Sequence, residues 1–158
     1  MMKEERIKFL ISRYQQGVFA LVLYLIGGDQ DKTYDICASS FAEAMRACSS
    51  PEREGIFLAK VIGIAVEKAR AIKTIPVFKE LEFLDLPASE QGPLRLLIKA
   101  FWKLAFDDKA LVLLREQLNL SYRQIAAVMR KTESDTRSEV NQARTRLREI
   151  IEDTLKYE

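Results

Sequence analysis

The sequence predicts an all-α protein made of two small helical domains. Apolar residues recur at spacings of three and four along most of the 158 residues, which is the period of an amphipathic helix. Prolines near the middle of the chain interrupt this pattern, and a short helix, a tight turn and a long basic helix are expected at its end. Hydrophobic residues make up 48% of the sequence, which is enough for a buried core.

Residues 1–73 are expected to form a three-helix domain. Its first helix covers residues 3–26 and ends at Gly27-Gly28, because glycine adopts the backbone conformations that close a helix. The second starts after Asp29 or Asp31, either of which can act as the N-cap. The core stripe expected for this second helix is Tyr34, Cys37, Ala38, Phe41, Met45 and Cys48.

The third helix is expected to begin at Ser50-Pro51, with serine as the N-cap and proline at the first helical position. Prolines and glycine then rule out a continuous helix up to Pro93, so residues 74–93 are the predicted linker, with a short helical turn near residues 78–83. The residues expected inside the third helix are Phe57, Val61, Ile64, Ala65, Lys68 by its stem, and Ile72.

Residues 94–158 are expected to form a second domain of about four helices. The first should start at Leu94, and the second should be capped by Asp107 or Asp108 and end near Asn119. Trp102 is assigned to the core, with an interface role as the alternative. The stripes expected for these two helices are Leu94, Leu97, Ile98, Phe101, Trp102 and Ala105, and then Leu111, Leu114 and Leu118.

A helix-turn-helix is expected between residues 120 and 151. Ser121 and Gln124 form a capping box that starts a short helix, and Thr132 or Ser134 can cap the next one. A short helix, a tight turn and a long basic helix match the geometry that places a recognition helix in the DNA major groove. A solvated arginine-rich face is the alternative. The last helix carries Arg137, Arg144, Arg146 and Arg148 against Glu139, with Val140, Ala143, Leu147 and Ile150 facing the core.

Composition argues against several other classes of protein. Without histidine, a glycine-rich phosphate loop or a cysteine beside a candidate base, the sequence offers no catalytic constellation, so no enzyme and no cofactor is expected. Cys37 and Cys48 cannot build a zinc site alone and fit packing on one helical face. The longest apolar run, residues 18–26, is too short to span a bilayer. A cytoplasmic protein without a membrane anchor or signal peptide is expected.

The stretches LSYRQIAAVM and SEVNQARTRLREI resemble region 4 of the extracytoplasmic-function sigma factors of bacterial RNA polymerase. The stretch RYQQGVFALVLYLIGGDQDKTYDICASSFAEAMR resembles region 2 of the same family, in the order that the family has. The resemblance therefore covers nearly the whole chain. The matching positions are Tyr14, Val18, Leu25, Gly28, Asp29, Asp35, Ile36, Phe41, Gly55, Phe57, Ile64, Ala65, Leu120, Ser121, Tyr122, Ile125, Ala126, Ala143, Arg144, Arg146, Leu147 and Arg148.

The resemblance implies a sigma factor that binds core RNA polymerase and double-stranded promoter DNA. Region 2 would grip the clamp helices of the largest polymerase subunit, with Asp35, Ile36 and Phe41 as the polymerase-binding residues. Region 4 would dock on the flap of the second large subunit and read the upstream promoter element. Some members of the family are held inactive by an anti-sigma partner. The DNA-facing positions carried over are Arg137, Ser138, Asn141 and Arg144, with Arg123 and Lys131 as contacts to the DNA backbone.

The chain departs from the family at functional positions. Ala38-Ser39 stands where the family has a Gln-Glu pair, and Arg130 replaces the usual glycine of the turn. These differences favour an alternative: a sigma-derived interaction module that binds a regulator or the polymerase without reading DNA. The other departures are Lys60 and Glu67 near the strand-opening surface, Asp135 in place of threonine and Glu139 in place of arginine.

Overall fold

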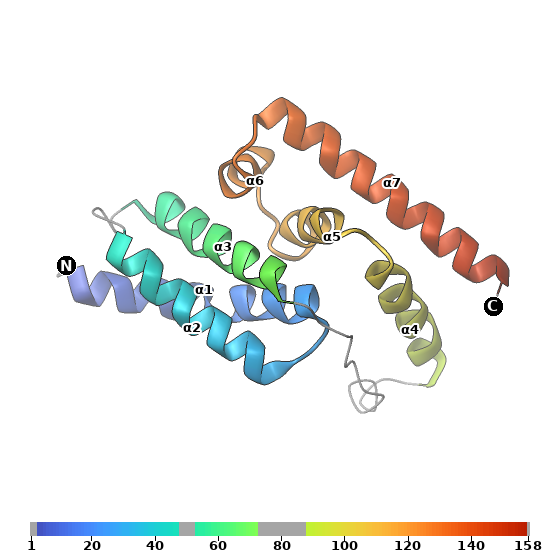
Figure 1. Cartoon of the computed structure of the whole chain (residues 1–158), viewed down its shortest axis with the longest axis horizontal. Coiled ribbons are helices and arrows are strands. Elements are labelled where there is room, and N and C mark those ends of the chain that lie inside the picture. Colours follow the sequence, from blue (N-terminus) through green and yellow to red (C-terminus); the bar gives the residue numbers. More distant parts are fainter. Residues whose placement is uncertain (1–2, 48–52, 73–87, 158) are drawn as a thin grey trace.

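The computed structural model describes residues 3–47, 53–72 and 88–157. Within these residues, three helices form the N-terminal half and four form the C-terminal half, so the predicted all-α fold is confirmed (Figure 1). A π-helical segment, η2, directly continues α5. The elements are α1 (Lys3–Ile26), α2 (Gln30–Ala47), α3 (Glu54–Ala71), α4 (Ala88–Trp102), α5 (Phe106–Val112), η2 (Leu113–Gln117), α6 (Tyr122–Met129) and α7 (Glu133–Tyr157).

α1 has the predicted bounds and ends as predicted at two glycines. Gly27 and Gly28 have φ of 88° and 95°, in the left-handed region that favours glycine. By length and composition alone, Glu4–Ile26 could cross a membrane. In the fold, however, one face of α1 packs against α2 and α3, which explains its apolar character. The α1 side chains with at most 2% exposure are Leu10, Val18, Leu21, Val22, Leu25 and Ile26.

α2 starts as expected at Asp29, whose Oδ1 accepts a hydrogen bond from the backbone N–H of Lys32 at 3.0 Å. Its predicted core stripe is partly wrong: Tyr34 is 68% exposed and Ala38 also faces solvent, whereas Cys37 and Phe41 are buried. The helix is turned so that polar Thr33 and Ser40 face the bundle, and Cys48 lies outside the described residues. The buried residues of α2 are Thr33, Ile36, Cys37, Ser40, Phe41 and Ala44.

α3 is buried on two faces. Phe57, Val61 and Ala65 face the core as predicted, but Ile62 and Val66 are also only 1% exposed. The prediction missed this second face because it belongs to a contact with α6, far away in the sequence. The expected start at Ser50-Pro51 lies outside the described residues.

Glu54, at the start of α3, ties α1 to α3. Its carboxylate accepts hydrogen bonds from the Tyr14 hydroxyl and from Arg6 Nη2, the latter at 3.2 Å, and pairs with Arg13 Nη1 at 3.1 Å. The hydrogen bond from Tyr14, together with the two guanidinium groups, lowers the pKa of Glu54. The side chain of Glu54 is 25% exposed, so this network lies at the edge of the bundle.

Acidification should weaken this network. A carboxyl group with a lowered pKa in the folded chain stabilises the fold above its unfolded pKa, about 4.3, and loses that contribution as the pH falls through its folded pKa. We expect the free energy of unfolding, measured by urea denaturation, to fall on acidification through this window. Tyr14→Phe should reduce the dependence, because the hydrogen bond that most lowers the pKa is then absent. An unchanged pH profile in Tyr14→Phe would contradict the assignment.

Two expectations for the C-terminal half are wrong. α4 begins at Ala88 rather than Leu94 and contains Pro93 inside the helix. A proline at such a position removes the hydrogen bond to the carbonyl four residues earlier and crowds that carbonyl, which is why the sequence favours a start after Pro93. Neither Asp107 nor Asp108 caps α5, since Ala105 holds the N-cap position without a side-chain hydrogen bond. The predicted helical turn near residues 78–83 lies outside the described residues.

Asn119 ends the α5–η2 unit as predicted, with φ of 52°. The final turn of this unit is π-helical, which the sequence did not predict: the N–H of Leu118 donates to the carbonyl of Leu113 at 3.1 Å, five residues back. Trp102 is half-buried, and the ammonium of buried Lys109 lies 3.5 Å from its ring centroid. The core assignment of Trp102 is therefore confirmed only in part.

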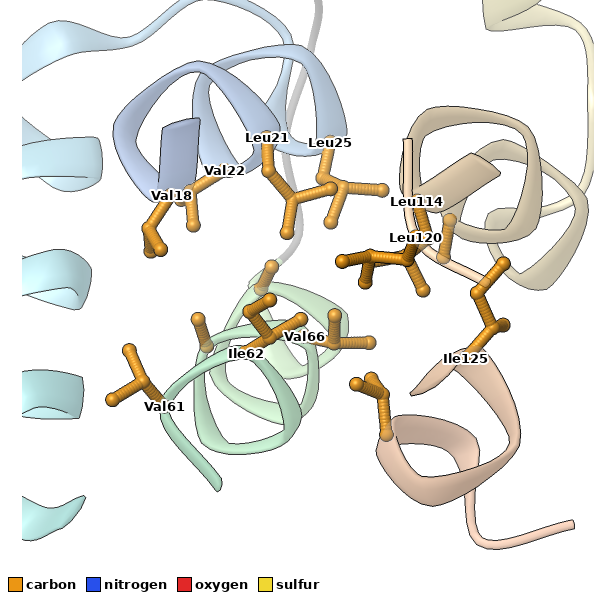
Figure 2. Close-up of a cluster of buried hydrophobic side chains, with 14 of the residues drawn as sticks. Val18, Leu21, Val22, Leu25, Val61, Ile62, Val66, Leu114, Leu120 and Ile125 are labelled. Carbon is orange, nitrogen blue, oxygen red and sulfur yellow. The ribbon is translucent and has the colours of Figure 1, made fainter. Parts of the chain in front are cut away.

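The two halves share one hydrophobic core. Figure 2 shows Leu21 and Leu25 of α1 and Ile62 and Val66 of α3 facing side chains of the C-terminal half. Those side chains are Leu114 of η2, Leu120 and Ile125, and all belong to the same buried cluster. Close approach of backbone also joins the halves, since a Cβ at Gly63 of α3 would lie 3.5 Å from the carbonyl oxygen of Val128 in α6. The helix-turn-helix thus rests directly on the N-terminal bundle.

Candidate nucleic-acid interface

The first helix of the helix-turn-helix starts at the predicted capping box. Ser121 Oγ accepts a hydrogen bond from the N–H of Gln124 at 3.1 Å, and Gln124 Oε1 accepts one from the N–H of Ser121 at 2.8 Å. Ile125, Ala126 and Val128 of α6 are buried. α6 is therefore fixed at its start by hydrogen bonds and along its length by apolar packing.

The corner between α6 and α7 has a closed turn geometry. Arg130 adopts φ 56° and ψ 50°, the left-handed conformation expected if the turn keeps its usual shape without glycine. The N–H of Lys131 donates to the carbonyl of Ala126 at 3.0 Å, and Thr132 Oγ1 accepts from the N–H of Asp135 at 3.1 Å. Thr132, one of the two predicted N-caps, thus fills this role. A non-glycine residue in this conformation costs about 1 kcal/mol.

α7 forms the outer edge of the molecule, with α4, α5 and α6 along its inner side (Figure 1). Val140 and Ala143 are fully buried, as predicted, together with Thr136, which the prediction omitted. The outward side carries exposed Arg137, Ser138, Asn141 and Gln142. A recognition helix must keep one polar face free for base edges, and α7 meets this requirement.

The six residues predicted to contact DNA lie on α6, on the corner and on α7. Arg123, Lys131, Arg137, Ser138 and Asn141 are exposed, while the side chain of Arg144 is 35% exposed. The four residues on α7 do not form one continuous stripe, because Arg144 turns toward η2. Its Nε donates to Glu116 Oε1 at 2.7 Å, and its Nη2 contacts the same oxygen. This hydrogen bond is the largest cause of the raised pKa of Arg144.

Tyr122 is a part of this surface to which the sequence assigned no role. Two guanidinium groups contact its ring, with Arg115 and Arg137 each 4.6 Å from the ring centroid. Arg137 also pairs with Glu133 at 3.7 Å. The ring therefore restrains Arg137 without neutralising it, through cation–π contact. The only sequence signal for this contact is that Tyr122 is followed directly by the basic residue Arg123 and lies within 15 residues of Arg115 and Arg137.

Arg146 has a structural role, although its side chain is 53% exposed. Its Nη1 donates to both carboxylate oxygens of Asp108, at 2.8 and 3.0 Å. The side chain of Asp108 is only 11% exposed, so this ion pair anchors α7 to α5. The sequence offered Asp107 or Asp108 as a helix cap. It could not indicate the pairing of Asp108 with Arg146, because the two residues are 38 positions apart.

A second candidate surface is an apolar groove between α1 and α2, of about 610 Å³. Of the three residues predicted to bind polymerase, only Asp35 is exposed; Ile36 and Phe41 are each 6% exposed. Phe41 lines the groove, whereas Ile36 is buried elsewhere on α2 and is not among the lining residues. Burial raises the pKa of Cys37 to about 11, so its thiol stays protonated at neutral pH. The groove is lined by Ile11, Gln15, Gln16, Phe19, Tyr34, Cys37, Ala38, Phe41, Ala42 and Met45.

Three of the residues that differ from the sigma-factor pattern lie at the junction of the halves. Lys60 and Glu67 of α3 line a groove of about 840 Å³ together with Arg130 of the corner. The sequence could not place Arg130 beside Lys60 and Glu67, because the contact depends on how α6 packs on α3. Within the described residues, no group of three or more metal-ligating side chains occurs.

The comparison with solved structures assigns the fold. The chain matches the structure of CnrH in complex with the cytosolic domain of CnrY, with a TM-score of 0.69 and 17% sequence identity, over 93% of this chain and 88% of the matched chain. CnrH is an extracytoplasmic-function sigma factor. This chain has the same fold as CnrH. No protein-family model matches the sequence, and no match is found among curated proteins. The sigma-factor fold covers both halves and includes the helix-turn-helix.

Proposed function

We propose that the chain is an extracytoplasmic-function-like sigma factor that binds core RNA polymerase and directs it to promoters. The observation that carries the proposal is the helix-turn-helix on a sigma-factor fold, with a capping box at its start, a left-handed corner at Arg130 and an exposed polar face on α7. Such a protein recruits the polymerase and catalyses nothing itself. It acts in the cytoplasm, where the polymerase and the promoter are found.

In this proposal α7 lies in the major groove. Ser138 and Asn141 would contact base edges, because asparagine pairs well with adenine and serine accepts several partners. Arg137 and Arg144 would contact the DNA near α7, with Arg123 and Lys131 on phosphates beside α6 and the corner. Phosphate contacts position the helix without reading sequence. All six side chains are at least partly accessible in the folded chain.

The N-terminal half would bind the clamp helices of the polymerase. Asp35 and the groove between α1 and α2 supply an acidic group next to an apolar surface, which suits an amphipathic helix of the partner. CnrH was solved with the cytosolic domain of CnrY bound, so an anti-sigma partner that covers these surfaces is also proposed here.

A gel-shift titration with salt tests the DNA-binding part. The full chain is added to duplex DNA selected from a random pool, and the dissociation constant is measured over a range of salt concentrations. Arg137→Ala with Arg144→Ala should weaken binding about tenfold or more at low salt and flatten the salt dependence by about 0.9 per lost contact. Lys8→Ala with Lys32→Ala removes the same charge from α1 and α2 and should leave binding almost unchanged.

A pull-down of core polymerase with the same proteins tests the other part. Retention of the large polymerase subunits by the chain and by the Arg137/Arg144 variant supports the proposal, because the N-terminal half supplies the main contact. If the unmodified chain does not retain the large polymerase subunits at low salt, the proposal is contradicted.

One observation favours the alternative of an interaction module that does not read DNA. Lys131, Arg144 and Arg146 each contact a carboxylate of the chain itself, so less positive charge is free on this surface than the sequence suggests. Under this alternative, the chain still binds polymerase or a regulator, but the gel shift shows weak binding with little dependence on salt.

A further inference from the structure

Two of the proposed DNA-contacting cations are held by carboxylates from another part of the fold. Lys131 Nζ, at the corner, lies 2.7 Å from Glu139 Oε2 of α7. Arg144 of α7 donates through Nε to Glu116 Oε1 of η2 at 2.7 Å. Each pair thus joins two elements, and each acid stands beside a cation that the proposed complex would use.

Both pairs lie at the surface. The exposed fractions of the side chains are 36% for Lys131, 34% for Glu139, 35% for Arg144 and 56% for Glu116. Pairs of this kind contribute roughly 0–1 kcal/mol to stability, since water screens them. The Asp108–Arg146 pair differs, because the side chain of Asp108 is only 11% exposed. The pairs of Glu139 and Glu116 therefore do little for the fold, but they strongly affect the charge of the surface.

A DNA phosphate and a carboxylate bind the same hydrogen-bond donors of arginine and lysine. A phosphate reaching Arg144 or Lys131 must therefore compete with the carboxylate already bound there, either for the same donors or against its negative charge. The released acid also remains near the DNA backbone and repels it. For comparison, Arg137 stacks on Tyr122, and its contact with Glu133 is longer, at 3.7 Å.

On this basis, we propose that Glu116 and Glu139 are internal competitors of the DNA backbone, which occupy Arg144 and Lys131 in the free chain and reduce its affinity for any duplex. The inference rests on the proposed DNA-binding function and adds that two acids of the chain itself lower the affinity of the free chain for DNA. Because phosphate contacts carry no sequence information, this effect acts on all DNA sequences alike. The free chain would then stay off bulk DNA unless further contacts, such as those of bound polymerase, contribute to binding.

The test uses Glu116→Gln and Glu139→Gln in the full chain, since glutamine keeps the shape and removes the charge. Each change should raise affinity for both a selected and an unrelated duplex by about threefold to tenfold at low salt, and should steepen the salt dependence by about 0.9 for each cation released. Glu149→Gln is the matched control, because it removes one exposed acid of α7 that has no ion pair in the described residues. Its effect measures the general influence of one unit of charge.

A double-mutant cycle shows whether the effect passes through the paired cation. The gain from Glu116→Gln should disappear in an Arg144→Ala background, and the gain from Glu139→Gln should disappear with Lys131→Ala. Equal effects of Glu116→Gln, Glu139→Gln and Glu149→Gln would overturn the inference while leaving DNA binding intact. Absence of salt-dependent DNA binding in the unmodified chain and in every variant would instead reject the proposed function itself, and the inference with it.

Discussion

Leu114→Ala should destabilise the entire chain by about 3 kcal/mol, because a leucine truncated in a packed core loses its burial and leaves a cavity. Leu114 is fully buried at the junction of the halves, near Leu25 of α1 and Leu120 (Figure 2). The free energy of unfolding, measured by urea denaturation, should fall in one cooperative transition. Hydrogen exchange should show α1 and α6 losing protection together, since both contribute to one cluster.

Leu155→Ala provides the control for this prediction. Leu155 is 59% exposed on α7, so its truncation should change stability by less than about 0.5 kcal/mol. Two separate unfolding transitions in Leu114→Ala, with α1 still protected after α6 has opened, would show that the halves fold independently. That result would contradict the shared core as the main source of stability.

Arg146→Met should cost about 2 kcal/mol, since it leaves the carboxylate of Asp108, whose side chain is only 11% exposed, without its partner. Methionine keeps an apolar stem of similar length, which isolates the loss of the charge. Asp108 would then remain largely buried between α5 and α7 without its guanidinium partner. Thermal and urea denaturation measure this loss directly.

Two further variants make the prediction specific. Adding Asp108→Asn to Arg146→Met should recover part of the loss, because the isolated buried charge is removed. Arg148→Met changes an exposed arginine without an ion pair in the described residues and should be nearly neutral. If Arg146→Met and Arg148→Met have equal effects, the ion pair with Asp108 does not anchor α7.

Local signals in the sequence were sufficient for most helices and for the parts of the helix-turn-helix. The capping box of Ser121 and Gln124, the N-cap at Thr132 and the stop at Asn119 depend on residues within a few positions of each other. The inner face of α7 was also predicted correctly, because apolar periodicity depends on residues three and four positions apart. The predictions were less successful where packing against other helices decides which side of a helix is buried. Tyr34, for example, fits the apolar period of α2 but lies on its exposed side.

Residue patterns along the chain were enough to predict the all-α class, the order of the helices and the residue types on the outer face of α7. The packing of α6 on α3, the pairing of Asp108 with Arg146, and the pairing of Arg144 and Lys131 with Glu116 and Glu139 became visible only in the folded chain. The difference lies in the range of the interactions. Helix starts, stops and amphipathic faces follow from hydrogen bonds and periodicity over a few residues, whereas ion pairs between elements depend on how whole helices approach one another.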